Sequence, residues 1–311
     1  MNVLVLCPAK TATGGPETLH KLVGDLNGYK DVSAKILYVG KDLSNPQPEV
    51  YKTYRAPYIT EFPTGYEGVV IVPEIWANNI LDPKYRNCKK AIFWLSVDNY
   101  KKRVSKADED LCFKDKSILH MTQSFYVEEY VRGLGAKRVF PISEPVNKEF
   151  FRDYRETQRS NVVLYNPAKM TKFQEQLMKE ATIYEDIYFK PLKGLTIEQM
   201  ADELRTHKLY IDFGPFPGRE RIPREAVLCG CCLITGKNGA SQYFKDIPIL
   251  SKYKFESENS NIGSIIAAMK HILQNYETCR PDFDYFRSIL RDEWAGIIEI
   301  IGELREVLNE I

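Results

Sequence analysis

Four charged side chains crowd the start of one expected helix, and their types favour anion binding. Arg219, Arg221, Arg224 and Glu225 lie in one short segment around Pro223. Pro223 suits the first helical position, because its missing N–H costs nothing there, and Arg224 and Glu225 then fall in the first turn. A helix N-terminus favours anions, and guanidinium groups match phosphate oxygens. We therefore expect these arginines to include phosphate ligands.

The residues that follow complete a helix, a tight turn and a strand. Gly230 is expected to end the helix, and residues 231–235 form a short buried strand. A carboxylate beside a phosphate site suits a sugar hydroxyl, so Glu225 points to a phosphorylated sugar or a nucleotide as the ligand. The structural alternative is that Glu225 only offsets the helix dipole and that some of the arginines pair with Glu220 or face water.

Bulk composition is that of an ordinary globular protein. The chain has 311 residues, 44% hydrophobic and 27% charged, which favours two domains of roughly 150 residues each. The formal net charge of +1 gives no global field that would demand nucleic acid. We therefore expect a small-molecule partner and no nucleic acid.

Cysteine usage and the N-terminus indicate where the protein works. Most of the seven cysteines lie in apolar runs and none forms a CxxC pair, as expected of reduced core thiols in a cytoplasmic protein. Residues 3–7 are already a strand, so no signal peptide is expected, and no apolar run reaches the roughly 20 residues that span a bilayer. A peripheral association with the inner face of the membrane stays open.

Short apolar runs alternate with helical patterns, which favours parallel sheets with crossover helices. The first half has candidate strands at 3–7, 34–39, 69–72, 91–95, 118–121 and 138–142, with helices at 16–26 and 125–134. The second half has strands at 161–165, 187–190, 208–213 and 231–235, with helices at 172–179, 197–206, 223–229, 239–245 and 262–276. The polar stretch 144–160 is the expected linker.

The expected fold class is α/β, with two doubly wound Rossmann-like domains that face a cleft. Residues 1–150 form the first domain, 151–281 the second, and 282–311 make amphipathic helices that cross back to the first. Ligands of such sheets bind at the carboxyl ends of strands. These ends bring Gly14 and Gly15, together with the segments 73–74, 96–99, 166–169, 190–195, 213–221 and 236–241, near one cleft.

The order of these segments resembles the GT-B glycosyltransferases, and within them the large retaining family that uses nucleotide-diphosphate sugars. The first strand and Gly14-Gly15 look like that fold's glycine loop, segment 190–196 looks like its nucleobase loop, and 223–230 looks like its glutamate helix. Segment 120–142 looks like the last strand, helix and return strand of the first domain. A branch acting in bacterial surface-polysaccharide synthesis is most similar, and the resemblance covers nearly the whole chain.

The resemblance implies roles for particular residues. Glu225 would bind the donor ribose, and Lys169 would neutralise the leaving diphosphate, although Lys169 also fits a surface lysine at a helix start. Donor binding would involve Lys190, Leu192, Gly194 and Leu195 at the base and Gly14, Gly15, Arg219, Arg221 and Arg224 at the phosphates. No Asp-x-Asp metal motif is visible between the halves, so neither a metal nor another cofactor is expected.

Two positions depart from the family pattern. The position eight residues before Glu225, where the family has a second glutamate, is Pro217, and backbone groups of Pro217 and Gly218 or the Arg219 side chain would substitute for it. Where many relatives have a histidine near the donor sugar, this chain has Ser96 and Asp98. The contact to the donor sugar is therefore built differently from the family pattern.

Two carboxylates and one histidine of the first half need separate interpretation. Glu74 and Asp98 follow strand ends and are candidate catalytic or acceptor-side groups. Lys169 is a further catalytic candidate, on the donor side. The structural alternative is that Glu74 and Asp98 cap turns or pair with basic residues. His120 lies within an expected strand, which favours a core histidine over a catalytic base.

The sequence therefore predicts a glycosyltransferase with a nucleotide-sugar donor and a carbohydrate or lipid-linked acceptor. Two alternatives stay open. One is a nucleotide-sugar epimerase of the same fold, which would need more catalytic carboxylates and histidines around the sugar. The other is an inactive donor-binding subunit that supports a partner glycosyltransferase, because the first glutamate is missing.

Overall fold

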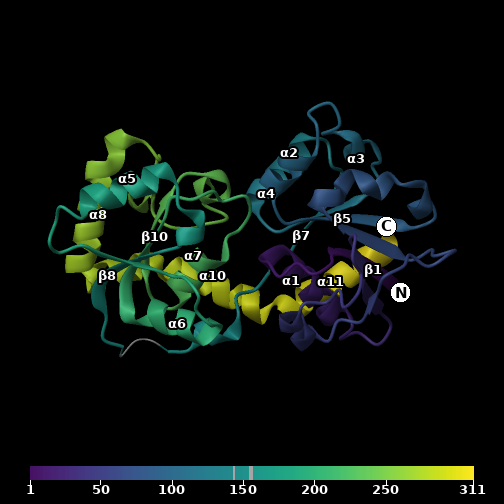
Figure 1. The fold of residues 1–311 in the computed structure, drawn as a ribbon, viewed down its shortest axis with the longest axis horizontal. Coiled ribbons are helices and arrows are strands. Elements are labelled where there is room, and N and C mark those ends of the chain that lie inside the picture. The colour runs from purple at the N-terminus through teal and green to yellow at the C-terminus, as the bar shows by residue number, and fades with distance from the viewer. Residues whose placement is uncertain (143, 154–156) are drawn as a thin grey trace. The chain divides into compact units, whose positions relative to one another are not determined.

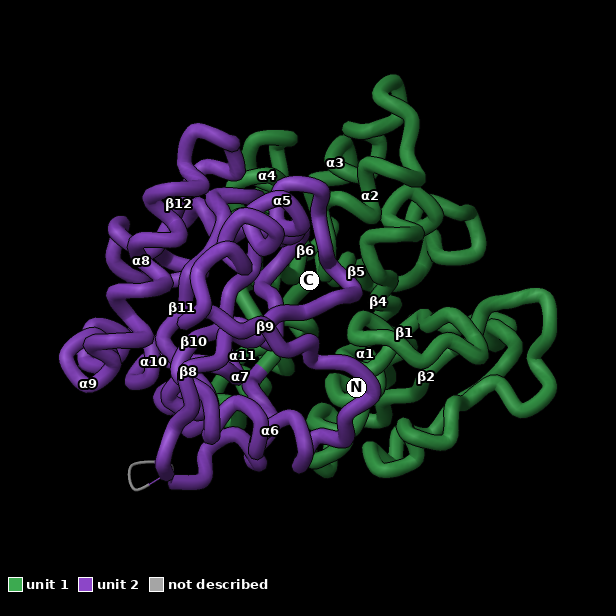
Figure 2. The backbone as a smooth tube through the Cα atoms, turned by 60° about the vertical axis from the view of Figure 1, so that its left-hand side comes forward, with its two compact units in different colours: residues 1–144, 296–311 green, residues 145–295 purple. Residues whose placement is uncertain are grey.

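Short runs of buried apolar residues form two parallel β-sheets in the computed structural model, which describes residues 1–142, 144–153 and 157–311 (Figure 1). The described chain divides into two units. Unit 1 contains Met1–Glu144 and Gly296–Ile311, and unit 2 contains Pro145–Ala295 (Figure 2). Part of the expected linker, at 154–156, lies outside the described residues. The chain therefore builds one sheet domain, then a second, and returns to the first.

The sheet of unit 1 has seven parallel strands in the order β3-β2-β1-β4-β5-β6-β7. The strands are β1 (Asn2–Pro8), β2 (Ser33–Val39), β3 (Tyr58–Ile59), β4 (Val69–Pro73), β5 (Lys89–Trp94), β6 (Leu119–Thr122) and β7 (Arg138–Pro141). Successive side chains of a strand face opposite sides of a sheet. Val5 and Leu6 of β1 accordingly belong to different core clusters, so the sheet is covered on both faces.

Helices cover each face of this sheet. On one face pack α1 (Gly14–Leu26) and α11 (Ile297–Glu310), which also contact each other (Figure 1). The other face is covered by the 3-10 segment η2 (Glu74–Leu81) and by α2 (Val97–Arg103), α3 (Leu111–Lys114) and α4 (Phe125–Gly133). Two further 3-10 segments are η1 (Glu49–Tyr54) and η3 (Pro83–Tyr85).

The sheet of unit 2 has five parallel strands in the order β12-β11-β10-β8-β9. The strands are β8 (Ser160–Tyr165), β9 (Tyr188–Pro191), β10 (His207–Asp212), β11 (Cys232–Gly236) and β12 (Lys254–Phe255). Between them run α5 (Lys172–Ala181), α6 (Ile197–Thr206) and α7 (Arg221–Leu228). After β12 come α8 (Ile262–Gln274), α9 (Tyr276–Cys279) and α10 (Asp284–Ala295). The 3-10 segments are η4 (Lys148–Phe151), η5 (Pro167–Lys169), η6 (Gly239–Gln242), η7 (Ser251–Tyr253), η8 (Asn259–Asn261) and η9 (Arg280–Phe283).

The helices of unit 2 form two pairs on opposite sides of the sheet. α5 packs against α8, and α6 packs against α7, and Figure 1 shows the two pairs on either side of β8 and β10. The strand order reverses between β8 and β10, where consecutive connections leave toward opposite sides. In doubly wound sheets the ligand crevice lies at such a switch point, at the carboxyl ends of the strands. Unit 1 has the corresponding reversal between β1 and β4.

Every strand range expected from the sequence overlaps a strand of the structure. The strands β3 and β12 were not expected, because each has two residues and no periodic pattern. The helix expected at 239–245 is only the 3-10 turn η6. Fold class therefore follows the apolar pattern, whereas short elements do not.

The two units divide after Glu144 and after Ala295, whereas the expected domain boundaries are at 150 and 281. All of segment 282–311 was expected to cross back to the first domain, but α10 packs on α7 within unit 2 and only α11 belongs to unit 1. Phe286 and Leu290 bury the apolar face of α10, whereas Ile301, Leu304 and Leu308 of α11 join the core around β1. An apolar helix face shows that a helix packs on something, but not which core it packs on.

Candidate functional site

The carboxyl ends of β8 and β10 meet at the switch point of unit 2. Lys169 ends η5, directly after β8, and Gly214 follows β10. A Cβ added at Gly214 would lie 2.7 Å from the Lys169 carbonyl oxygen and 2.9 Å from the Lys169 Cβ. Such distances are too short for any side chain but that of glycine. Gly214 therefore lets the two chain segments touch and fixes the place of Lys169.

Two acidic side chains, Glu220 and Asp212, lie near Lys169 at these strand ends. Its ammonium group forms an ion pair with Glu220, the N-cap residue of α7, and donates to the Pro215 carbonyl oxygen at 3.4 Å. Asp212 ends β10 and is 3% exposed. Its Oδ1 accepts the Gly214 N–H at 2.9 Å and its Oδ2 accepts the Tyr210 hydroxyl at 3.0 Å.

Burial raises the pKa of both Asp212 and Tyr210. It raises the pKa of Asp212 to about 6, although the Gly214 N–H and the nearby positive charge of Lys169 work in the opposite direction. Burial also raises the pKa of the Tyr210 hydroxyl, with further contributions from Asp212, Glu220 and Glu225. Lys169 thus lies near two carboxyl groups that differ in exposure.

Helix α7 begins two residues before the expected start. It runs Arg221–Leu228 with Glu220 as its N-cap residue, so Pro223 occupies the third helical position and not the first. The first four N–H groups of a helix lack intrahelical partners, so proline is tolerated at any of these positions. Arg221, and not Arg224, therefore opens the first turn.

The end of α7 is as expected. Gly230 adopts a left-handed conformation with φ of 94°, and the Gly230 and Cys231 N–H groups bond the Val227 and Ala226 carbonyl oxygens at 3.0 and 2.9 Å. This pattern of bonds is the Schellman motif, in which a glycine supplies the left-handed residue. It turns the chain directly into β11.

Two of the three arginines are buried, Arg219 in the loop that precedes α7 and Arg224 in the first turn of α7. Arg219 donates from Nη1 to Glu293 of α10 at 2.6 Å and from Nε to the Asp246 carbonyl oxygen at 3.4 Å. Arg224 is 1% exposed and donates to the carbonyl oxygens of Glu220 and Arg219 at 3.0 and 3.3 Å. These two guanidinium groups thus shape the loop, whereas Arg221 and Glu225 are only half-buried.

Side chains that sequence reasoning missed hold the same loop from other elements. Asn238, after β11, donates to the Gly214 carbonyl oxygen at 3.3 Å, and Gln174 of α5 accepts the Phe213 N–H at 3.0 Å. The Ala240 N–H bonds the Phe216 carbonyl oxygen at 2.9 Å. The place of Asn238 after a strand end could have marked it. Nothing in the sequence pattern of α5 distinguishes Gln174, because its role depends on the bond to Phe213, which is 39 positions away in the chain.

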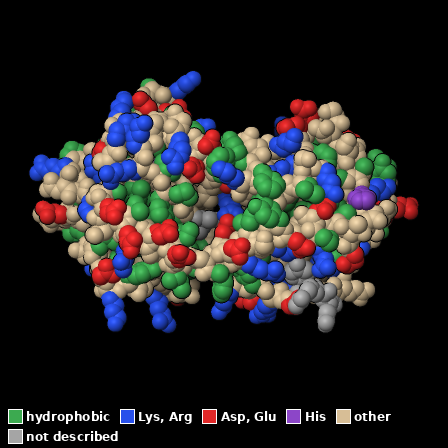
Figure 3. Space-filling view, turned by 180° about the vertical axis from the view of Figure 1, so that it is seen from behind, with side chains coloured by type: hydrophobic (Ala, Val, Ile, Leu, Met, Phe, Trp, Pro, Cys, Tyr) green, Lys and Arg blue, Asp and Glu red, His purple; other side chains and the backbone are tan. Residues whose placement is uncertain are grey.

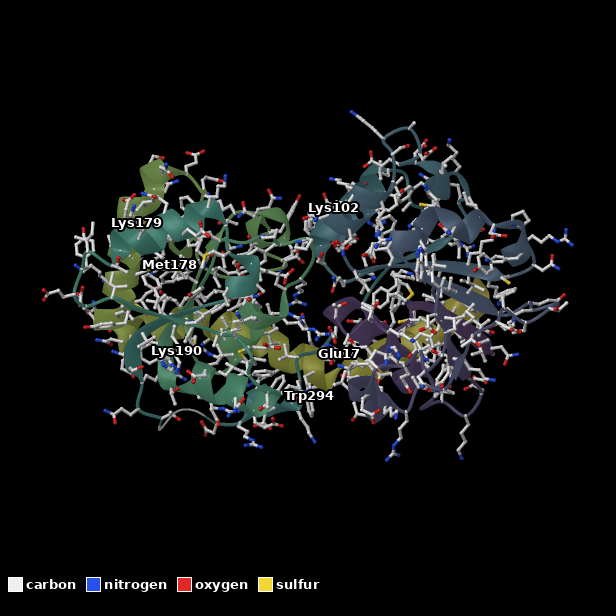
Figure 4. The ribbon with its side chains drawn as sticks, in the orientation of Figure 1. Glu17, Lys102, Met178, Lys179, Lys190 and Trp294 are labelled. Carbon is white, nitrogen blue, oxygen red and sulfur yellow. The ribbon has the colours of Figure 1, made fainter. Side chains whose placement is uncertain are left out.

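The segment after β9 matches the expected loop in position. Lys190, labelled in Figure 4, pairs with Glu203 of α6 at 2.8 and 2.7 Å. The N–H of buried Leu192 bonds the Tyr165 carbonyl oxygen at 2.9 Å. Gly194 has φ of 69° with open space where a Cβ would stand, and Leu195 is half-buried. The Thr196 side chain caps α6 in a reciprocal bond with Gln199.

Unit 1 brings its candidates to the carboxyl ends of β1, β4 and β5. Glu74 is 3% exposed, and its Oε2 accepts the Leu95 N–H at 3.1 Å. Burial raises the pKa of Glu74 to about 7, against the bonds from Leu95 and Asn99. Asp98 lies in the first turn of α2. Glu74 therefore holds the β5–α2 turn, which is the structural alternative considered for it.

Gly14 and Gly15 form the first turn of α1. A Cβ added at Gly15 would lie 3.5 Å from the Leu95 side chain, which is ordinary contact, so this position tolerates more than glycine. Thr18 donates to the Gly14 carbonyl oxygen at 2.9 Å and to Glu144 at 3.1 Å. These bonds fix the start of α1, which lies next to Leu95 after β5.

Two histidines of unit 1 are core residues. His120 accepts from Trp94 Nε1 at 3.0 Å, and burial lowers its pKa to about 4, which confirms the expectation of a core histidine. His20 is 0% exposed and is bonded to the Pro16 carbonyl oxygen and the Tyr38 hydroxyl. Because both side chains are buried in the core, neither histidine is placed to act as a catalytic base.

Three further observations concern the surface charge, the cysteines and the helices. On the face drawn in Figure 3, Lys and Arg side chains are interspersed with Asp and Glu. All seven cysteines are buried free thiols. Among the residues described, no helix is both long and apolar enough to cross a bilayer.

Comparison with known proteins identifies the fold. No protein-family model and no curated protein matches the chain. Solved structures do match over almost the full length of both chains. A glycosyltransferase from Rickettsia africae has a TM-score of 0.68 at 12% identity and covers 99% of this chain and 98% of its own.

Two more solved structures have the same architecture. Sucrose-phosphate synthase from Thermosynechococcus elongatus has a TM-score of 0.67 at 12% identity, with 99% of both chains covered. HepE from Anabaena, in complex with UDP, has a TM-score of 0.68 at 11% identity, with 100% of both covered. At these identities the likeness concerns the fold, and this chain has the GT-B fold of glycosyltransferases.

Proposed function

We propose that this GT-B chain is a glycosyltransferase that moves a sugar from a nucleotide-diphosphate donor to a carbohydrate or lipid-linked acceptor. The observation that carries the proposal is the switch point of unit 2, where Gly214 holds Lys169 beside the start of α7. HepE, which shares the fold, binds UDP and UDP-glucose. A crevice at a strand-order reversal, with a cation and a helix N-terminus, suits a diphosphate.

The residues then divide into three groups by role. Glu225 binds the ribose hydroxyls of the donor, and the loop with Lys190, Leu192, Gly194 and Leu195 receives the base. The diphosphate lies between Lys169 and the N–H groups of α7, where Arg221 is the half-buried arginine. Backbone groups of Pro217 and Gly218 take the place of the missing glutamate at the sugar.

Lys169 acts on the leaving group. In the reaction the bond between the anomeric carbon and the β-phosphate oxygen breaks, and an acceptor hydroxyl forms the new bond and loses its proton. The nucleoside diphosphate leaves with the bonding electrons, so its charge grows in the transition state. A fixed cation and helix N–H groups stabilise that charge without reorganisation. On the acceptor side, Glu74 and Asp98 follow the ends of β4 and β5 in unit 1.

The reaction proceeds with retention of the anomeric configuration and without a metal ion in this proposal. Retention is supported by the resemblance of residues 223–230 to the glutamate helix of retaining enzymes. Metal independence is supported by Lys169 and α7, which can supply the positive charge. Turnover that persists in excess EDTA is the expected result, and loss of turnover that Mg²⁺ or Mn²⁺ restores would contradict it.

A thermal-shift screen of nucleoside diphosphates and nucleotide sugars tests the donor site. A ligand at 100 times its dissociation constant adds about 2.7 kcal/mol to the unfolding free energy. One nucleotide series should raise the melting temperature of the wild type but not of Glu225→Ala. The control is Glu303→Ala, which changes an exposed glutamate of α11 and should keep the shift. No shift with any nucleotide would contradict the proposal.

Release of nucleoside diphosphate separates the alternatives. A transferase releases it only when an acceptor is present, whereas an epimerase converts the donor sugar without acceptor. Donor binding with no turnover on any acceptor would favour an inactive donor-binding subunit, and the absence of a carboxylate at Pro217 is the observation behind that second candidate.

A further inference from the structure

A buried carboxyl group lies behind Lys169, and the roles above do not use it. Asp212 is 3% exposed at the end of β10, in the crevice that we assign to the diphosphate. Among the described residues, the charged and titratable groups that act on it include Tyr210 of β10, Lys169 of η5 and Glu220 at the start of α7. Glu225 in turn acts on Tyr210.

Within the group of Lys169, Glu220 and Asp212, an ionised Asp212 opposes the binding of an anion. The Lys169 ammonium and the Glu220 carboxylate form an ion pair, so together they carry no net charge. An ionised Asp212 beside that pair adds one negative charge where two phosphate groups must bind. Glu220 has a side chain that is 21% exposed and therefore keeps contact with water, whereas Asp212 does not. The buried group is thus the one that gains most from losing its charge.

Asp212 also fixes the geometry of the crevice. Its Oδ1 accepts the Gly214 N–H at 2.9 Å, and Gly214 is the residue that packs against the Lys169 main chain. The Tyr210 hydroxyl holds the other oxygen at 3.0 Å. Both carboxyl oxygens are therefore tied, and through Gly214 they set where Lys169 stands.

We propose that Asp212 is a positioning residue for Lys169 and that its carboxylate takes up a proton when a nucleotide diphosphate binds beside Lys169. This inference rests on the proposed function. In the free protein, burial already raises the pKa of Asp212 to about 6. The added negative charge of a diphosphate raises it further. The proton comes from solvent and stays on the carboxyl group until the nucleotide leaves.

The sign of the pH dependence follows from these two states. Below the pKa of the free protein, about 6, Asp212 is protonated with or without ligand, so affinity does not change with pH. Between that value and the higher pKa of the complex, binding takes up a proton, and affinity falls as the pH rises. Above both values no proton is taken up and affinity is again constant, but weaker.

Titration calorimetry in buffers of different ionisation enthalpy measures the proton uptake at pH 7. The probes are UDP-glucose, ADP-glucose and GDP-mannose, titrated separately. Nucleotide sugars are chosen because a terminal phosphate, as in UDP, itself titrates at about pH 6. The number of protons that the wild type takes up for each nucleotide sugar bound should approach one. Asp212→Asn keeps an acceptor for the Gly214 N–H and should show no uptake and no change of affinity with pH.

A second Tyr–Asp pair in unit 2 supplies the matched control. Tyr253 donates to Asp282 at 2.7 Å, and Lys252 is the cation at that pair. Asp282→Asn should therefore keep the proton uptake of the wild type. Tyr210→Phe removes the hydroxyl that stabilises ionised Asp212, so it should move the affinity profile to higher pH and keep the uptake. A merely structural role for the pair would lower affinity equally at every pH.

The outcomes separate this inference from the function on which it rests. Binding without proton uptake in the wild type, or equal uptake in Asp212→Asn, would overturn the role of Asp212 and leave the donor site in place. Failure of every nucleotide sugar to bind would overturn both.

Discussion

Glu74 and Asp212 are both buried carboxyl groups, and the environment of each departs from what its position in the sequence suggests. Glu74 follows β4 and Asp212 ends β10, where a ligand group is expected, and each accepts a backbone N–H that fixes a turn. Burial raises the pKa of both. A carboxyl group of this kind holds the local structure and at the same time responds to pH.

Glu74→Gln should flatten the pH dependence of stability. The pKa of Glu74 rises from 4.5 to about 7 on folding, so its contribution is fully present below pH 4.5 and is lost as the pH rises through 7. The wild type should lose up to about 3 kcal/mol from this group between pH 5 and pH 8. Glutamine keeps the acceptor for the Leu95 N–H but cannot ionise.

Urea unfolding of both proteins at pH 5 and pH 8 measures this difference. The exposed Glu61→Gln is the control and should follow the wild type at both values. If Glu74→Gln loses as much stability as the wild type over this range, Glu74 is not the group that titrates.

Lys169→Ala should lower turnover far more than donor binding. The Lys169 ammonium is assigned to the charge that grows on the leaving diphosphate, and removal of one such group typically costs about 10²–10³ in kcat. Lys172→Ala is the matched control, because Lys172 is an exposed lysine at the start of α5. Steady-state kinetics with the donor found in the screen measures both. A kcat within about twofold of the wild type would remove Lys169 from the mechanism.

At the scale of elements, the crevice depends on how closely two strand ends approach. Gly214 lets the end of β10 touch η5 after β8, and Asn238 and Gln174 hold the loop from β11 and α5. Helix α7 then starts from that loop and ends in the Gly230 turn. The placement of Lys169 thus depends on β10 and η5, which touch, and on the elements that hold the loop after β10.

Gly214→Ala should destabilise the protein and weaken the donor site. The added methyl group would lie 2.7 Å from the Lys169 carbonyl oxygen, a backbone atom that cannot rotate away. Overpacking of this kind costs about 1–3 kcal/mol. Gly263→Ala is the control, because nothing lies within 4 Å of an added Cβ there and alanine favours helix α8. Thermal unfolding with and without donor measures both effects, and a Gly214→Ala protein as stable as the wild type would contradict the contact.

At the scale of the whole molecule, the chain ends by returning to the unit in which it began. Helix α11 places Ile301, Leu304 and Leu308 in the same core as β1 and α1, and the Tyr29 hydroxyl donates to the Ile298 carbonyl oxygen at 2.8 Å. Unit 1 therefore needs residues 296–311 for its core, although most of its sequence lies before residue 145.

Leu304→Ala should destabilise unit 1. Leu304 is 0% exposed, and truncation of a buried leucine costs about 2–5 kcal/mol. Ile298→Ala on the same helix is the control, because Ile298 is 76% exposed and should change stability by less than about 0.5 kcal/mol. Hydrogen exchange of β1 and α1 reports on unit 1 separately from unit 2. Equal protection in the two variants would mean that α11 does not support this core.

Local patterns were sufficient for much of the molecule. The apolar runs predicted the strands, the left-handed turn at Gly230 followed from glycine's freedom, and the order of motifs indicated the GT-B fold. These features depend on residues close together in the chain, so their spacing carries the information. The start of α7 was misplaced, because proline suits several positions in a first turn.

Which charges meet depended on the tertiary structure. Arg219 and Glu293 are 74 positions apart, Lys169 and Glu220 come from different elements, and burial of Asp212 depends on strands and loops that surround it. Ion pairs and pKa shifts depend on distance and desolvation in space, and neither is written in the spacing of residues along the chain. The composition of the site could therefore be anticipated from the residue order, whereas its charge state came from the fold.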